Sequence, residues 1–153
     1  MGPELPPPRR VVLADGADGR TRVVADGPAP RPGRLASIWS CEATPPLPSD
    51  GAEPGLADTF PPPGGFRFMV VDLSPDVDKP PSTDERYAGF HRTDSYDCGV
   101  VVSGSVILEL DDGEVELHAG DTFVQCGGNH AWRNPNPEPC RVAFVLIGAD
   151  RSE

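Results

Sequence analysis

Positive charge is scarce in this chain of 153 residues. Lysine and arginine together number 13 against 24 aspartate and glutamate residues, so the formal net charge is −11, and Lys79 is the single lysine. Nucleic acids and anionic membrane surfaces are bound by clustered basic residues. The charge balance therefore argues against both kinds of partner and favours simple solubility.

Long apolar runs are also missing. Hydrophobic residues make up 37% of the chain, and no stretch approaches the length that spans a membrane. The first ten residues, MGPELPPPRR, contain no apolar segment of the kind that a secretory signal needs. We therefore expect a cytoplasmic protein, and the length suits one domain with its own core.

Paired cysteine motifs are absent. The four cysteines, Cys41, Cys98, Cys126 and Cys140, form no C-x-x-C pair. This argues against a zinc ribbon and against a thioredoxin-like site. In a reducing compartment, scattered thiols of this kind usually act as small buried hydrophobes.

Helical periodicity is absent as well, because no stretch keeps a helical repeat of apolar residues for three turns. Short apolar runs instead alternate with turn signals such as Ser103-Gly104, Asp112-Gly113 and Gly127-Gly128, a pattern typical of antiparallel β-structure. The Asp-Gly pair is the strongest hairpin signal. The runs between residues 99 and 125 are expected to pair as hairpins. The predicted strands are residues 11–14, 21–25, 35–41, 66–73, 99–102, 106–110, 114–117, 122–125, 130–133 and 141–147.

Proline is unevenly distributed, since 17 of the 20 prolines precede residue 82. We therefore divide one domain into an irregular N-terminal part, residues 1–84, and a regular core, residues 85–149. Residues 44–65 are mostly Pro, Gly, Asp and Ala. A structureless loop of about twenty residues is unusual in a compact domain. We expect this segment to be a lid or a contact between subunits, with disorder as the alternative.

The stretch from His91 to Asn134, HRTDSYDCGVVVSGSVILELDDGEVELHAGDTFVQCGGNHAWRN, carries the spacing that matters for function. Its first part resembles the first motif of the cupin superfamily, G-x5-H-x-H-x3-E-x6-G. When the last glycine of the motif is placed on Gly104, Asp97 takes the position of the glutamate. Thr93 then takes the position of the second histidine and His91 that of the first.

The second part resembles the second cupin motif, G-x5-P-x-G-x2-H-x3-N, when it is anchored on His130. Gly127 and Asn134 then match, Gln125 takes the position of the proline, and Gly120 lies one residue too close. More narrowly, HRTDSYD, GNHAWRN and CRVAFVLI are similar to short single-domain cupins that are linked to small-molecule metabolism.

The resemblance implies an all-β fold, a cupin-type jelly-roll β-barrel in which extra N-terminal strands extend one sheet. Such barrels hold a metal ion or a small molecule inside. Related proteins commonly pair through their extra strands, so the resemblance also implies a homodimer.

A metal cupin supplies three imidazoles and one carboxylate, and here Thr93 removes one imidazole. The resemblance therefore implies His91, Asp97 and His130 as metal ligands, a set that could bind Fe, Mn, Ni or Zn. It also allows a site without any metal, in which His130 and Asp97 act by themselves as catalytic groups.

Further side chains are candidates for the same site. An indole contributes a large apolar area and one hydrogen-bond donor, so Trp132 beside the second motif is expected to form part of the pocket wall. Tyr96 is a candidate general acid, or else a packing residue. If Cys98 and Cys126 both face inward, they could bind a soft metal together with His130. The predicted substrate pocket consists of Trp39, Thr93, Cys126 and Trp132.

Three functional hypotheses follow. The favoured one is an enzyme that converts a small organic molecule inside the barrel by non-redox chemistry, as a lyase or isomerase that dehydrates, decarboxylates, isomerises or cyclises its substrate. The second is an iron-dependent dioxygenase that uses His91, Asp97 and His130. The third is a cupin that binds a small ligand without catalysis.

Overall fold

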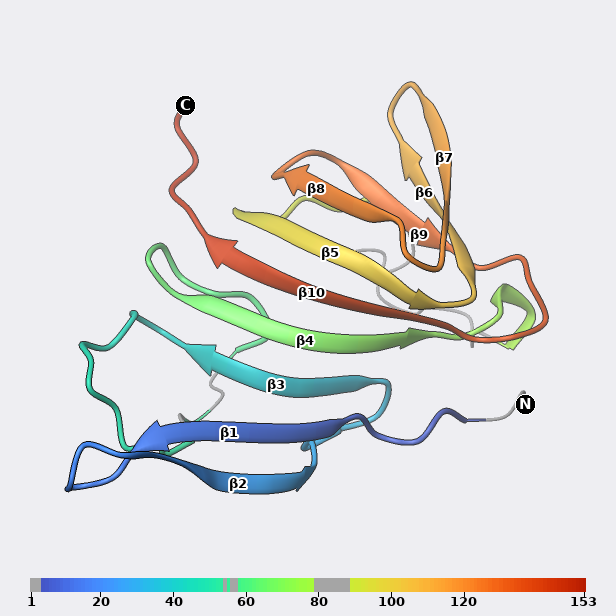
Figure 1. The fold of residues 1–153 in the computed structure, drawn as a ribbon. Helices are drawn as coiled ribbons and strands as arrows, with labels where there is room; N and C mark the ends of the chain where they lie inside the picture. Colours follow the sequence, from blue (N-terminus) through green and yellow to red (C-terminus); the bar gives the residue numbers. More distant parts are fainter. Residues whose placement is uncertain (1–3, 54, 56–57, 79–88) are drawn as a thin grey trace.

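The computed structural model describes residues 4–53, 55, 58–78 and 89–153, and within them the chain is almost entirely β-structure (Figure 1). A short 3₁₀ turn, Asp76–Asp78, is the only helical segment of the described part, and no helix there could span a membrane. The predicted boundary between residues 84 and 85 lies outside the described residues. The strands are β1 (Arg9–Asp15), β2 (Thr21–Pro28), β3 (Leu35–Cys41), β4 (Phe66–Leu73), β5 (Ser95–Ser103), β6 (Ser105–Leu110), β7 (Gly113–His118), β8 (Thr122–Cys126), β9 (His130–Arg133) and β10 (Cys140–Gly148).

Two antiparallel sheets pack face to face, as in a jelly roll. One has the order β3-β4-β10-β5-β8 and the other the order β7-β6-β9, while β1 and β2 form a separate ribbon beside β3 (Figure 1). The prediction of an all-β jelly roll with additional N-terminal strands is thereby confirmed. The core between the sheets consists of Val101, Val106, Leu108, Leu117, Cys140 and Val142.

The pairing of the middle strands differs from the prediction of successive hairpins. Strands β6 and β7 do form the hairpin around Asp112-Gly113, but β5 and β8 pair with each other in the opposite sheet. The chain leaves β5 for the other sheet at Gly104, whose φ of 78° lies in the left-handed region that glycine favours. Hydrophobic alternation alone does not specify which strands become neighbours. The sequence therefore does not predict that the chain passes from one sheet to the other between β5 and β6.

The loop before β4 is tied to the barrel by Arg67, whose side chain is fully buried. Its guanidinium donates hydrogen bonds to the carbonyl oxygens of Asp58 at 2.9 Å and Cys41 at 3.0 Å, and it pairs with the Glu42 carboxylate. A buried guanidinium needs such partners, because an unpaired buried charge is costly. Arg67 therefore holds the two ends of the loop near the end of the barrel.

Candidate functional site

A cavity of about 180 Å³ lies between the two sheets. Its wall is mostly apolar and contains a few polar groups, which is the usual composition of a site for a small molecule. The lining residues come from both sheets and from the loop before β4: Leu35, Thr59, Phe60, Met69, Val71, Leu73, His91, Thr93, Asp97, Phe123, Gln125, His130, Trp132, Val142, Phe144 and Leu146.

Asp97 reaches this cavity from β5 and has 7% of its surface exposed. The hydroxyl of Ser95 donates a 2.6 Å hydrogen bond to Oδ1, and the hydroxyl of Thr93 donates one of 3.3 Å to Oδ2. Burial raises the pKa of the Asp97 carboxyl above its usual 3.8, and the two hydroxyls together with His130 and His91 oppose that rise. Burial is the dominant cause, so this carboxyl keeps its proton to a higher pH than an exposed aspartate does.

His130 begins β9 on the opposite sheet and is 3% exposed. Its Nδ1 lies 3.0 Å from the carbonyl oxygen of Gly128 and 2.7 Å from the side-chain amide nitrogen of Gln125. In the tautomer that serves proton transfer, Nδ1 carries the proton and donates to the Gly128 carbonyl, the Gln125 amide turns its oxygen to the ring, and Nε2 keeps its lone pair. Burial lowers the pKa of His130 below 6.5, against the Gly128 hydrogen bond, which raises it. The ring is therefore neutral at physiological pH.

His91 lies directly beside His130. The backbone N–H of each residue donates to the carbonyl oxygen of the other at 3.0 Å. The centroids of the two imidazole rings are 4.5 Å apart. Two imidazoles thus share one side of the cavity, and the charge of His91 lowers the pKa of His130 further.

The three predicted metal ligands all line the cavity, but they do not form a metal centre as arranged. Among the described residues, no group of three or more His, Cys, Asp or Glu side chains could hold a metal ion. Both oxygens of Asp97 already accept hydrogen bonds from hydroxyl groups. Metal binding by His91, Asp97 and His130 stays a prediction, and the chemistry derived below uses the side chains alone.

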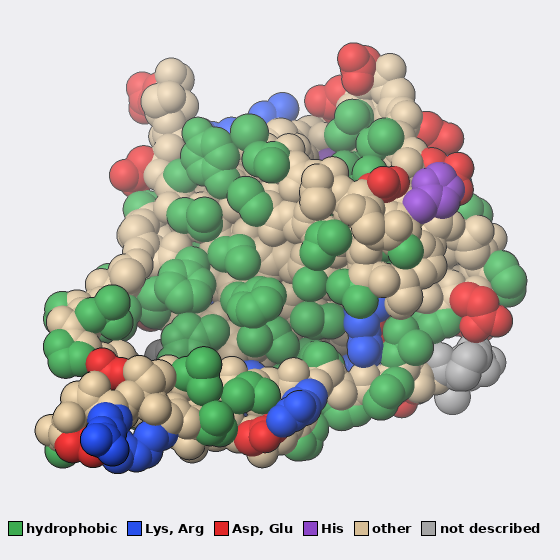
Figure 2. Space-filling view, in the orientation of Figure 1, with side chains coloured by type: hydrophobic (Ala, Val, Ile, Leu, Met, Phe, Trp, Pro, Cys, Tyr) green, Lys and Arg blue, Asp and Glu red, His purple; other side chains and the backbone are tan. Residues whose placement is uncertain are grey.

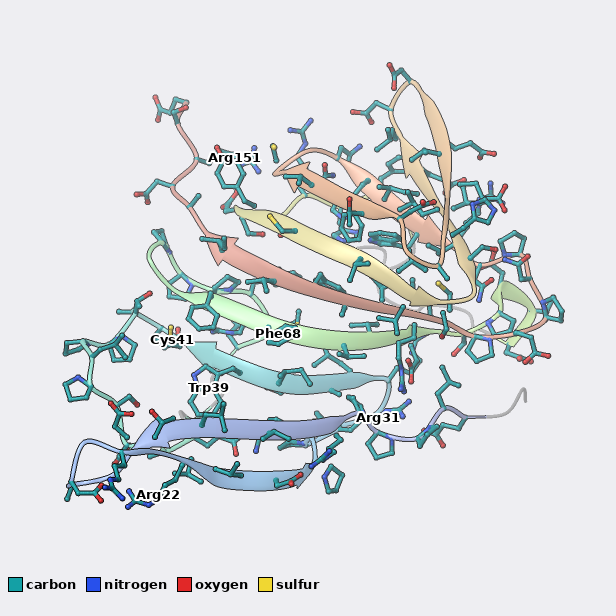
Figure 3. All side chains as sticks on the ribbon, viewed as in Figure 1. Arg22, Arg31, Trp39, Cys41, Phe68 and Arg151 are labelled. Carbon is teal, nitrogen blue, oxygen red and sulfur yellow. The ribbon has the colours of Figure 1, made fainter. Side chains whose placement is uncertain are left out.

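The structure brings two of the four predicted pocket residues, Thr93 and Trp132, to the cavity. The other two, Trp39 and Cys126, do not line it. Cys126 is exposed on the outer face of β8. Trp39 pairs with Phe68 of β4 and lies toward β1 (Figure 3). The prediction that Trp39 and Cys126 belong to the pocket is corrected accordingly.

Tyr96, the candidate general acid, is also placed elsewhere. It neighbours Asp97 on β5 and is 51% exposed, because successive side chains of a strand point to opposite faces. Its hydroxyl belongs to the outer surface of the sheet, together with the exposed thiol of Cys98. The cavity therefore retains His130 and Asp97 of the predicted catalytic set, and the soft-metal site built from both thiols is ruled out by their outward direction.

Two polar residues of the site were not predicted as such. Ser95 shares the inward face of β5 with Asp97, which the two-residue period of a strand indicates once the strand is known to begin at Ser95. Gln125 pairs with Asp97 across β5 and β8 and contacts His130. In the sequence Gln125 was visible only as a departure from the proline of the second motif.

Two facing antiparallel sheets that enclose an apolar cavity, with a carboxyl from one sheet and an imidazole from the other, define a small-molecule barrel of the jelly-roll class. The model of the cupin domain family matches residues 80–147. The cupin domain of Cnp3 from Schizosaccharomyces pombe has the same fold, with a TM-score of 0.52 at 12% identity over 92% of this chain and 87% of that one. Residues 80–147 of the chain thus match a cupin domain, and the chain has the fold of a cupin.

Curated relatives come from biosynthesis clusters and from a group of oxidoreductases. Phomopsin biosynthesis cluster protein C' of Diaporthe leptostromiformis is 39% identical over 89 residues, which are 57% of this chain and 42% of that protein. The cupin-domain-containing oxidoreductase fogC of Aspergillus ruber is 33% identical over 87 residues, 54% of this chain and 38% of that protein. The chain thus matches less than half the length of these relatives.

Proposed function

We propose that this protein converts a small, largely apolar organic molecule inside the barrel by proton transfer, as a lyase or an isomerase. The observation that carries the proposal is the pairing of Asp97 and His130 in one apolar cavity. Burial raises the pKa of the carboxyl and lowers that of the imidazole. These shifts favour the protonated carboxyl, the form that acts as a general acid, and the neutral imidazole, the form that acts as a general base.

The two side chains have complementary roles in this chemistry. Neutral His130 accepts a proton from a carbon or hydroxyl of the substrate through Nε2, and Gly128 holds the ring through Nδ1. Asp97, in its protonated form, donates to an oxygen of the substrate. In a dehydration, the proton from the carbon moves to His130, the C–O bond breaks, and the hydroxyl leaves as water with the proton of Asp97. In an isomerisation, His130 returns its proton to a different atom.

A second candidate reaction is an oxidation, and the observation that favours it is the name oxidoreductase of the relative from Aspergillus ruber. An iron-dependent dioxygenase would require a redox-active metal, and the donors His91, Asp97 and His130 do not converge on one point as arranged. We therefore place this reaction second. A cupin that binds its ligand without turnover is the third function.

Turnover under anaerobic conditions tests these functions against one another. The purified protein is incubated with a chelator and with a panel of β-hydroxy ketones, β-keto acids and β,γ-unsaturated ketones, and the products are followed by mass spectrometry. The proposal expects conversion of at least one class without dioxygen and without sensitivity to the chelator. Turnover that requires iron and dioxygen selects the oxidation, and tight binding without turnover selects the binding function.

We also propose that the functional unit is a homodimer formed through the outer face of the five-stranded sheet. Figure 2 shows apolar side chains gathered over this face. The apolar side chains of this face carry no charge, and its charged residues Asp72 and Arg141 are paired with each other, so a second copy can pack against it without burying an unpaired ion. The outward side chains are Phe68, Tyr96, Cys98, Val124, Cys126, Val145 and Ile147.

The mass in solution, measured by light scattering, tests the dimer. A charge at Val124, which is 66% exposed, should break the interface without disturbing the fold of one copy. We expect a dimer for the wild type and a monomer for V124D. The matched control is V77D, because Val77 is 91% exposed on the 3₁₀ turn. A monomeric wild type, or a V124D variant that remains dimeric, contradicts the proposal.

A further inference from the structure

A second hollow opens beside the cavity. It has a volume of about 370 Å³ and is lined by the loop before β4, by residues 92–94 and by residues 149–151. Phe60 and Thr93 belong to the linings of both hollows. The two hollows therefore lie side by side, with Phe60 and Thr93 between them.

Two arginines line this outer hollow, and one of them, Arg151, has structural partners within the protein. The Nε of Arg151 donates to the Asp94 carboxylate at 2.6 Å, and its Nη2 donates to the carbonyl oxygens of Thr93 at 3.0 Å and Gly127 at 2.9 Å. Figure 3 shows Arg151 beyond the end of β10, near the start of β5. Its charge is balanced by Asp94, and its donors are largely used.

The other arginine, Arg92, is exposed and has neither an ion pair nor a side-chain hydrogen bond within the part of the chain that the structure describes. Most described arginines differ from it, since carboxylates hold eight of them: Arg9, Arg10, Arg22, Arg31, Arg67, Arg133, Arg141 and Arg151. A chain with a net charge of −11 supplies many carboxylates. A guanidinium that lines a hollow and has no partner is therefore available to a ligand.

Arg92 lies next in the chain to residues of the apolar cavity, so one ligand can be placed near Arg92 and near the catalytic pair. It stands between His91 and Thr93, two residues that line the apolar cavity. Alternation along the chain sends its own side chain to the outer hollow instead. The imidazole of His91 thus lines the cavity, and the guanidinium of the next residue, Arg92, lines the neighbouring hollow.

We propose that the substrate is a small amphipathic carboxylic acid. Its apolar body occupies the cavity and its carboxylate is bound by Arg92 in the outer hollow. A planar guanidinium matches a carboxylate with two parallel hydrogen bonds. The carboxylates of Asp94 and Asp150 in the same lining disfavour a ligand with two negative charges, which is why a carboxylate fits better than a phosphate. This proposal rests on the proposed function, since it assigns the substrate class of the same site.

Binding of a matched pair of probes tests the assignment without any need for turnover. The probes are 4-phenylbutyrate and its neutral amide, which have the same apolar body, and their affinities are measured by calorimetry. We expect the wild type to prefer the carboxylate by about tenfold, as one charge-assisted hydrogen-bonded pair contributes. In R92Q the preference should disappear because the carboxylate binds more weakly, while the affinity for the amide stays unchanged. The control R34Q removes an arginine that lines neither hollow and should leave the preference intact.

Equal affinity of the wild type for both probes, a preference that survives in R92Q, or failure of both probes to bind at millimolar concentration overturns the assignment. Its failure is distinct from failure of the proposed function. If the protein prefers the carboxylate through Arg92 but shows no proton-transfer activity, the assignment of the ligand class stands and the proposed enzymatic function is rejected. If the protein transfers protons to and from neutral ketones but R92Q has no effect on binding, the proposed function stands and the assignment of a carboxylate ligand is rejected.

Discussion

The carboxyl of Asp97 and the imidazole of His130 reach one cavity from opposite sheets, Asp97 from β5 and His130 from β9. Each charge favours the ionised form of the other, so the attraction raises the pKa of His130 and lowers that of Asp97. Burial acts in the opposite direction on both groups and is the larger effect. The pair is consequently held closer to the uncharged state than the same residues would be in water.

The titration of His130 should show these opposing effects one at a time. In the wild type we expect its pKa to lie below 6.5. Replacing Asp97 by Asn removes an attraction and should lower the pKa further, whereas H91Q removes a repulsion and should raise it. The ring signals followed by NMR across the pH range provide the measurement. A wild-type pKa at or above 6.5, or shifts of the opposite sign in the two variants, would show that burial does not dominate.

The stability of D97N should depend on pH in a defined direction. Because the pKa of Asp97 is raised in the folded protein, the folded state binds this proton more tightly than the unfolded state does. The resulting stabilisation is present below the ordinary value of 3.8 and is lost as the pH rises through the folded value. Wherever Asp97 is ionised, the wild type must bury a charge that D97N lacks.

We therefore expect D97N to be more stable than the wild type at pH 7, by on the order of 1 kcal/mol, with the difference closing toward about pH 4. Urea unfolding at several pH values measures it. Since His130 faces the same carboxyl, its protonation in acid should make the closing steeper. A D97N variant that is less stable than the wild type at pH 7 and gains relative stability in acid would contradict the account.

The sequence predicts the fold far better than it predicts the side of a strand on which a residue lies. Turn signals and apolar runs locate all ten strands of the described ranges, because they are local properties of the chain. The sequence offers Tyr96 as a general acid or as a packing residue, and a strand expected from residue 99 leaves the direction of Tyr96 open. With the strand starting at Ser95, the inward direction of Asp97 requires that Tyr96 point outward.

Trp39 shows a different limit. Leu35 lines the cavity, and Ser37 pairs with Met69, which lines it as well. Simple alternation would send Trp39 inward after them, but the register of β3 against β4 shifts between Ser37 and Trp39. Such a β-bulge inserts one residue and reverses the faces beyond it. Nothing in the pattern of apolar residues marks the shift, so only the structure reveals it.

Arg67 should be among the most sensitive positions of the N-terminal part. Its replacement by Met leaves the carbonyl groups of Cys41 and Asp58 without their donor and removes the tie between the two ends of the loop. We expect a loss of about 3 kcal/mol in the free energy of unfolding. The control E42Q should cost less than about 1 kcal/mol, because the Glu42 side chain is 50% exposed. Equal losses in both variants would assign the effect to the ion pair rather than to the carbonyl groups.

Gly148 should be intolerant of any side chain. A Cβ at this position would lie 1.9 Å from the carbonyl oxygen of Pro62, in the loop that carries Phe60 to the cavity. We expect G148A to lower the free energy of unfolding by about 2 kcal/mol, as overpacking does, and to weaken binding of the amide probe. The control is G27A, since nothing lies within 4 Å of a Cβ added at Gly27. Thermal unfolding of the two variants side by side measures the difference, and similar melting temperatures would contradict the packing argument.

The incorporation of deuterium tests the central claim, that Asp97 and His130 transfer protons to and from a ligand in this cavity. Any ketone of the panel that the wild type converts is incubated in D2O with the wild type, D97N and H130N, and deuterium at the carbon next to the carbonyl is measured by mass spectrometry. The account predicts incorporation by the wild type, a loss of at least about a hundredfold in both variants, and retention of the affinity for the unconverted amide probe. Incorporation that survives in both variants, or that disappears only when metal is removed from the wild type, would contradict it.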